Sequence, residues 1–302
     1  MKKVVKFGGS SLASAEQFKK VGAIIRADGT RRYVVPSAPG KRFSEDTKVT
    51  DLLYACYRAA NEEIFQKVLA EIKSRYQEII DGLELSLSLE EDFKILEDNF
   101  RKQIGEEYAA SRGEYLNGKI MAAYLGYTFV DPAEMIRFDG NGQFDAEITE
   151  ALVAKRLKDV TEAVVPGFYG AKENGEIKTF SRGGSDITGS IIAGALDVEL
   201  YENWTDVSGV MVTDPRIIPN PKSIDTITYR ELRELSYMGA TVLHEDAIFP
   251  VRKAGIPINI KNTNAPEEDG TMIVEDTCKK PPYTITGIAG KKDFVLFLSK
   301  NP

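Results

Sequence analysis

The chain has 302 residues, of which 42% are hydrophobic and 28% charged, as in an ordinary globular protein. Its length suits one large domain or two ordinary ones. The formal net charge of −7 argues against nucleic-acid binding, because there is no excess of cations to neutralise phosphates. Two distant cysteines and one histidine fit a reducing cytoplasm and predict no metal site. No apolar run approaches membrane-spanning length, so we expect a cytoplasmic protein without a membrane segment.

Hydrophobic periodicity predicts strands that alternate with helices along the chain. The expected strands lie at 4–7, 33–36, 127–130, 163–165, 198–201 and 256–260, with a hairpin at 172–180 that turns at Asn174-Gly175. The expected helices lie at 15–27, 50–58, 61–82, 90–104, 147–157, 185–196, 228–238 and 243–254. This order predicts an α/β fold, a three-layer αβα sandwich with a largely parallel central sheet and a helical insertion at about 60–110.

Three loops of small residues each follow a predicted strand and precede a helix: GGSS at 8–11, SAPG at 37–40 and SRGGSD at 181–186. Backbone N–H groups at such helix starts bind anions, and glycine lets a phosphate come close. One such loop would fit a simple turn equally well. Three of them, two with an adjacent lysine or arginine, predict a phosphate-handling site. No Walker P-loop, protein-kinase motif or Rossmann fingerprint accompanies them.

A fourth stretch, WTDVSGVMVTDPR at 204–216, contains two Thr-Asp pairs and ends on an arginine. Its hydroxyls and carboxylates could hydrogen-bond a base and a ribose, while Arg216 could pair with phosphate oxygens. By itself the stretch is explained equally well by a capped turn with a solvated arginine. It supports nucleotide binding only together with the three loops.

These stretches resemble the catalytic region of aspartate kinases, in the amino acid kinase family. The matching segments run in family order from residue 4 to about 275: KFGGSSLAS, VTDLL, SRGE, VPGFYG, FSRGGSDITGSIIAGAL, WTDVSGVMVTDPR and MGATVLH. The resemblance implies an αβα sandwich in which ATP and an amino acid meet at the carboxyl ends of the strands. It also implies that ATP, as a co-substrate with Mg²⁺, phosphorylates the β-carboxylate of L-aspartate. This reaction gives 4-phospho-L-aspartate and begins lysine, threonine and methionine biosynthesis.

The resemblance and the chemistry together point to two catalytic residues. Lys6, just before the Gly8-Gly9 turn, is expected to neutralise the transferring phosphoryl group. Asp186 is expected to orient Lys6 or substrate groups, although a carboxylate in the first turn of a helix is also favoured by the helix dipole alone. A carboxylate acceptor is already ionised at neutral pH, so no general base is required. Catalysis should therefore rest on positioning and electrostatic stabilisation.

The remaining site residues follow from the resemblance. Arg182 is expected to bind a substrate carboxylate and Glu114 the α-ammonium group, although a solvated helix carboxylate is the alternative for Glu114. The other expected aspartate contacts are Ser37, Thr50, Phe168 and Ser185. Thr50 is preferred to Thr47 because Asp-Leu-Leu follows it. The expected nucleotide contacts are Lys6, Gly8, Gly9, Ser10, Thr205, Asp206, Asp214 and Arg216.

The resemblance also implies a domain organisation and leaves two alternatives. Residues 1–280 are expected to form the catalytic domain, with a substrate-binding part at about 1–165 and an ATP-binding part at about 166–280. Residues 281–302 resemble a linker and the start of a truncated ACT-like regulatory domain, and a homo-oligomer, dimeric or larger, is expected. One alternative is a sibling such as glutamate 5-kinase or N-acetylglutamate kinase, against which SRGE and SRGGSD argue. The other is a silent nucleotide-binding regulator, which would be expected to lack Lys6 or Asp186.

Overall fold

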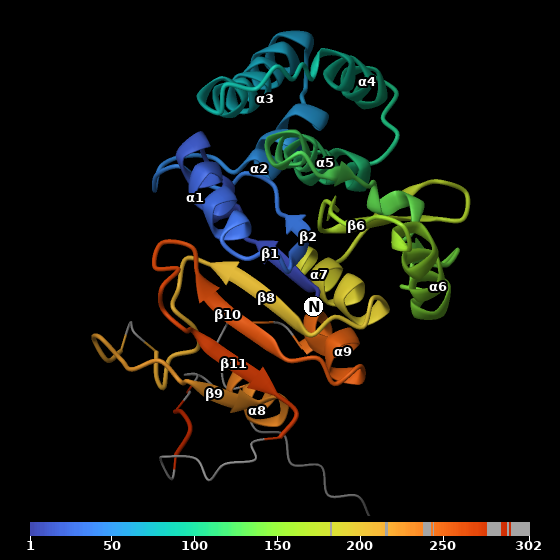
Figure 1. The fold of residues 1–302 in the computed structure, drawn as a ribbon. Coiled ribbons are helices and arrows are strands. Elements are labelled where there is room, and N and C mark those ends of the chain that lie inside the picture. Colours follow the sequence, from blue (N-terminus) through green and yellow to red (C-terminus); the bar gives the residue numbers. More distant parts are fainter. Residues whose placement is uncertain are drawn as a thin grey trace, which may run out of the picture.

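A computed structural model describes residues 1–181, 183–214, 217–237, 243, 245–276, 285–288 and 290. Within these ranges the central feature is an eight-stranded sheet in the order β3-β5-β2-β1-β8-β10-β11-β9 (Figure 1). Its strands, in chain order, are β1 (Lys3–Phe7), β2 (Arg31–Pro36), β3 (Thr128–Phe129), β5 (Ala163–Val164), β8 (Leu200–Thr205), β9 (Thr226–Thr228), β10 (Ile258–Asn262) and β11 (Thr271–Val274). A smaller sheet consists of β4 (Arg137–Phe138), β6 (Tyr169–Lys172) and β7 (Ile177–Thr179).

Most neighbouring strands of the large sheet are parallel. β1 pairs in parallel with β2 and β8, and the parallel pairing continues outward to β5 and β3 on one side and to β10 on the other. Only the β10–β11 pair is antiparallel within this sheet. The carboxyl ends of β5, β2, β1, β8 and β10 therefore meet at one edge, where the loops that follow them come together. The predicted α/β class with a largely parallel sheet is confirmed.

The helices lie on both faces of this sheet (Figure 1). They are α1 (Ala15–Arg26), α2 (Val49–Tyr57), α3 (Glu62–Gly82), α4 (Glu90–Arg101), α5 (Glu106–Leu125), α6 (Ala146–Leu157), α7 (Gly184–Ala195), α8 (Tyr229–Tyr237) and α9 (Glu245–Lys253), with short 3-10 helices at Gly9–Leu12 and Pro132–Glu134. Side chains of Ser14, Asn61 and Asp145 cap α1, α3 and α6 by accepting backbone N–H groups.

The alternation of strand side chains divides the core into two layers. Val4 and Val35 join a cluster with Ile191 of α7, whereas Val5 and Val34, one residue away, join the cluster on the other face. Each face of the central strands is thus apolar and covered by helices, as is typical of parallel sheets. The helical insertion forms α3 and α4, stacked at one end of the molecule (Figure 1).

Periodicity did not predict α5. This 20-residue helix is buried on nearly all sides, and its buried residues include Ala109, Leu116 and Ile120. It therefore lacks the exposed polar stripe that makes an amphipathic helix recognisable from its 3.6-residue period. The strands β4, β9 and β11 are short, with two to four residues, and were also not predicted. β8 runs from Leu200 to Thr205 rather than over 198–201. In the described part of the chain, no helix is both long and apolar enough to cross a membrane.

Candidate active site

Lys6 and Asp186 form an ion pair on the face of the sheet that α7 covers. Lys6 Nζ lies 2.6 Å from Asp186 Oδ1. Lys6 points to the same side of β1 as Val4, because side chains alternate along a strand, and this side packs against α7. Asp186 is in the first turn of that helix. The structure thus brings together the two residues that the sequence assigned to catalysis.

Asn203 completes this group and was not predicted from the sequence. Its Nδ2 donates a 2.8 Å hydrogen bond to the same Asp186 Oδ1 that faces Lys6. Asn203 lies on β8 directly opposite Lys6 in the parallel register and is 3% exposed. The signal in the sequence was an asparagine inside a buried central strand, where a carboxamide requires a hydrogen-bond partner.

Two of the predicted loops cross in front of this pair. The Gly40 N–H donates a 2.8 Å hydrogen bond to the Gly9 carbonyl, and a Cβ on Gly9 would lie 2.9 Å from the Ala38 carbonyl oxygen. The two loops could not approach each other so closely if residue 9 carried a side chain. A Cβ on Gly8 would lie 3.7 Å from Lys6 Nζ, so the ammonium group is next to the glycine turn. Lys6 and the turn are therefore close enough to contact the same ligand group.

Glu114 is buried in α5 and lacks a cationic partner among the described residues. Its Oε2 has no hydrogen-bond partner there, while the Ala38 backbone N–H donates to the carboxylate. Burial raises the pKa of Glu114 to about 8, against the lowering effects of that N–H and of the Arg112 charge. The interpretation of Glu114 as a solvated helix carboxylate is therefore wrong. A buried carboxyl group beside a substrate loop suits an ammonium ligand.

Two of the residues expected to contact aspartate, Thr50 and Ser37, lie against the same part of α5. A Cβ on Gly113 would lie 3.6 Å from Thr50 Oγ1, so the hydroxyl at the start of α2 faces the helix residue next to Glu114. The Ser37 carbonyl accepts a 2.7 Å hydrogen bond from Asn117 Nδ2, and Asn117 is fully buried. α5 thus holds the loop after β2 in place beside Glu114.

Phe168 and Ser185 meet where the loop after β5 reaches the start of α7. Phe168 has a φ of +83°, unusual for a residue with a side chain, and its N–H donates to Thr188 Oγ1 at 3.0 Å. Such backbone strain costs about 1–3 kcal/mol and concentrates at functional sites. A Cβ on Gly167 would lie 2.4 Å from Ser185 Oγ, so the two segments are in close contact. Arg182, the residue expected to bind a substrate carboxylate, lies outside the described residues.

The expected nucleotide contacts are less completely described. Ser10 is exposed beside the glycine turn, and Thr205 ends β8 at the same edge of the sheet. The Thr205 hydroxyl and an Asp206 carboxylate oxygen are 3.2 Å apart. Asp214 lies later in the same loop, and its backbone carbonyl accepts the N–H groups of the two residues at 217–218. Arg216 lies outside the described residues.

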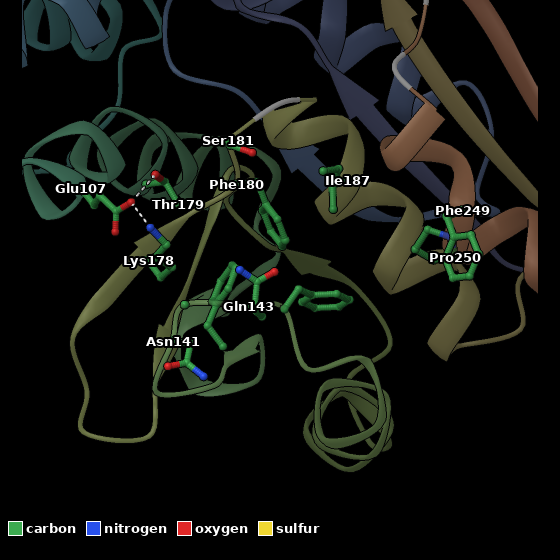
Figure 2. A pocket seen from close by; sticks show the side chains of 13 residues that line it. Glu107, Asn141, Gln143, Lys178, Thr179, Phe180, Ser181, Ile187, Phe249 and Pro250 are labelled. Atoms are coloured by element: carbon green, nitrogen blue, oxygen red, sulfur yellow. Dashed lines mark hydrogen bonds and ion pairs between the residues drawn. The ribbon is translucent and has the colours of Figure 1, made fainter. Parts of the chain in front are cut away.

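A cavity of about 500 Å³ lies next to this site, outside the β6–β7 hairpin (Figure 2). Lys178 on one wall pairs with Glu107 of α5, which ties the hairpin to that helix. Phe180 forms part of the aromatic floor. The cavity does not contain the Lys6–Asp186 pair, but its walls include Ser181 and Ile187, the neighbours of Arg182 and Asp186. The cavity therefore adjoins the segment that carries the SRGGSD motif without including the Lys6–Asp186 pair.

The chain matches a known protein family. A model described as the amino acid kinase family matches residues 1–262. The chain therefore belongs to the amino acid kinase family.

Within that family the chain is similar to aspartokinases. Aspartokinase 3 of Bacillus subtilis is 43% identical, over 99% of this chain and 69% of the relative. The crystal structure of Clostridium acetobutylicum aspartate kinase is 52% identical with a TM-score of 0.90, over 95% of this chain and 66% of that one. The structure of Escherichia coli aspartokinase III in complex with aspartate and ADP is 26% identical with a TM-score of 0.81, over 92% and 65%. The chain thus spans about two thirds of the length of these proteins, and the resemblance seen in the sequence is confirmed.

Proposed function

We propose that this chain is an aspartate kinase that transfers the γ-phosphoryl group of ATP to the β-carboxylate of L-aspartate. The observation that carries the proposal is the combination of two subsites on one sheet edge. One holds the Lys6–Asp186 pair beside the Gly8-Gly9 turn, and the other holds the buried carboxyl group of Glu114. The first suits a phosphoryl group and the second an ammonium group. Similarity to aspartokinases over nearly the whole chain supports the same substrates.

The reaction requires that one anion attack another. A β-carboxylate oxygen of aspartate attacks the γ-phosphorus, the bond from that phosphorus to the β,γ-bridging oxygen breaks, and ADP leaves with the electron pair. The Lys6 ammonium offsets the repulsion, and the N–H groups of the glycine turn are suited to bind phosphoryl oxygens. Asp186 holds Lys6 through the 2.6 Å ion pair, which fixes the cation on the path of transfer.

Aspartate is recognised by complementary charge. Glu114 pairs with the α-ammonium group, since a buried carboxylate without a cation gains most from a charged partner. Arg182 binds a substrate carboxylate through its planar fork of donors. The remaining contacts come from the residues at the edges of this pocket: Ser37, Thr50, Phe168 and Ser185.

ATP lies over the glycine turn and the loop after β8. Its contacts are assigned to Lys6, Gly8, Gly9, Ser10, Thr205, Asp206, Asp214 and Arg216. Mg²⁺ enters with the phosphates, because this ion keeps several waters and needs few protein ligands. Among the described residues no group of three or more His, Cys, Asp or Glu side chains could hold a metal ion. Asp186 is engaged by Lys6 and Asn203, so Lys6 and the turn amides make the protein's own contacts with the phosphoryl group.

Three further parts of the proposal rest on the sequence resemblance and on composition. The catalytic unit comprises residues 1–280, and residues 281–302, most of which lie outside the described residues, resemble the start of an ACT-like domain. The protein works in the cytoplasm and forms a homo-oligomer. Neither nucleic acid nor a membrane is among its partners, in keeping with the net charge of −7.

The test is an assay of ADP release over a panel of amino acids, with hydroxylamine to trap the acyl phosphate. Aspartate should give ADP and an equal amount of aspartyl hydroxamate, whereas glutamate and N-acetylglutamate should give neither. Turnover with either of those compounds would replace the proposal by a sibling kinase. Binding of ATP without turnover of any amino acid would replace it by a silent regulator.

A further inference from the structure

We propose that Asn203 is a positioning residue for phosphoryl transfer, which fixes the Asp186 carboxylate so that the Lys6 ammonium stays available to the substrate. The proposal rests on the proposed function, because it gives Asn203 a part in the same reaction. It adds a residue that neither the motifs nor the comparisons assign.

Two side-chain donors meet at one oxygen atom of Asp186. Asp186 Oδ1 lies 2.6 Å from Lys6 Nζ and 2.8 Å from Asn203 Nδ2. Lys6 and Asn203 are opposite each other on the adjacent parallel strands β1 and β8, and both side chains are nearly buried. The Asp186 carboxylate therefore meets a charged donor from one strand and a neutral donor from the next.

The packing around position 203 of β8 does not by itself require a carboxamide side chain. On the same face of β8, Tyr201 packs in the apolar cluster with Val4, and a leucine at position 203 would fill a similar volume. A buried carboxamide is tolerated only when it is hydrogen-bonded. The hydrogen bond that Asn203 donates to Asp186 is thus the interaction that a polar residue at this position supplies.

A neutral donor on this oxygen has a consequence for Lys6. If Lys6 were the only partner of Oδ1, the carboxylate could rotate with the lysine or hold it tightly as a closed ion pair. The Asn203 amide fixes the carboxylate from the sheet side and shares its negative charge without adding a second cation or anion. Lys6 is then held at a set position while part of its charge remains for the incoming phosphoryl group.

The experiment compares Asn203→Leu and Asn203→Asp with wild type and with Asn259→Leu as the matched control. Asn259 is a half-buried asparagine on the neighbouring strand β10, opposite Glu202 rather than Asn203. Asn203→Leu should lower kcat on the order of 100-fold, as for a displaced catalytic group, with little change in KM for aspartate or ATP. Asn203→Asp keeps the size but loses the donor and adds a charge, so it should lose at least as much. Asn259→Leu should keep wild-type kcat.

Two results would overturn the proposal. The first is a kcat within twofold of wild type in Asn203→Leu, or a loss that appears equally in both KM values and in thermal stability. The second result does not depend on activity. We expect a crystal structure of Asn203→Leu to show the Asp186 carboxylate in a new rotamer, and an unmoved carboxylate at the same distance from Lys6 would rule out the positioning role. If wild type itself failed to phosphorylate aspartate, the proposed function would fall, and the crystal structure would still decide whether Asn203 positions Asp186.

Discussion

Arg75 of α3 donates a 2.9 Å hydrogen bond to the carbonyl oxygen of Gly40, the glycine whose N–H in turn bonds to Gly9. Arg75 is 2% exposed, and the second terminal nitrogen of its guanidinium lies 3.0 Å from the Thr47 carbonyl and 3.1 Å from Asp46. One side chain of the helical insertion thus fixes the loop after β2 along most of its length. The insertion thereby supports the glycine turn beside Lys6.

The first prediction concerns this contact. Arg75→Met should destabilise the protein by about 3 kcal/mol, because it leaves the carbonyl groups of Gly40 and Thr47 without their donor, while Asp46 keeps its ion pair with Arg42. Loosening of Gly40 should also raise KM for ATP more than KM for aspartate, since the crossed glycine loops face the phosphoryl group. Urea unfolding and steady-state kinetics measure the two effects. Lys73→Met, on the same helix but exposed, is the control, and equal stability of the two variants would contradict the assigned role of Arg75.

Lys6→Ala should reduce turnover on the order of 100-fold or more, because it removes a charge that acts on the transition state. Folding should be nearly intact, since Asp186 retains Asn203 and is partly exposed to water. The measurement is kcat together with the circular dichroism spectrum. Lys19→Ala, an exposed change on α1, should behave as wild type. Near-normal turnover in a folded Lys6→Ala protein would refute the role.

The pKa of Glu114 predicts how aspartate use depends on pH. Since burial raises this pKa to about 8, the free protein holds Glu114 protonated and neutral at lower pH, and a neutral group cannot pair with the ammonium ion. We therefore expect kcat/KM for aspartate to rise with pH up to about 8, and aspartate binding below this pH to release a proton. Glu114→Gln should abolish this rise and raise KM for aspartate by roughly 10- to 100-fold, with KM for ATP unchanged. A wild-type profile that stays flat between pH 6 and 8 would contradict the assignment.

The same carboxyl group predicts an effect on stability. A pKa raised in the folded state means that Glu114 favours folding while protonated, and that this contribution is lost as the pH rises from the ordinary value of 4.5 towards 8. Glu114→Gln should therefore unfold at a higher temperature than wild type above pH 8, and the difference should shrink as the pH falls. Glu106→Gln, an exposed change at the start of the same helix, is the control for thermal unfolding.

Arg182→Lys tests the other charge in the aspartate subsite. A lysine keeps the positive charge but cannot reproduce the planar fork of two parallel hydrogen bonds. KM for aspartate should therefore rise far more than KM for ATP. Initial rates with each substrate varied at saturating levels of the other provide the measurement. If KM for ATP rose instead, Arg182 would belong to the ATP subsite and not to the aspartate subsite.

Features that depend on neighbours along the chain could be predicted from the amino-acid sequence. The periodicity of apolar residues was enough to predict the fold class. A lysine just before a glycine turn and the SRGGSD motif, taken with the family resemblance, predicted the Lys6–Asp186 group. The predicted helices at 15–27, 50–58 and 61–82 agree with the structure to within one or two residues. These features could be predicted because a helix cap, a turn and a periodic apolar face each depend on residues close together in the sequence.

Features that depend on partners far apart in the sequence arise only in the folded chain. Asn203 contacts Asp186 because β8 lies beside β1 in one particular register, and Arg75 reaches Gly40 because α3 folds back over the loop. The burial of Glu114 depends on α5, whose apolar surroundings on nearly every side leave no periodic pattern to read. Strand register and helix packing are set by the whole core, and a side chain acquires its partner, its burial and its pKa only when that core has formed.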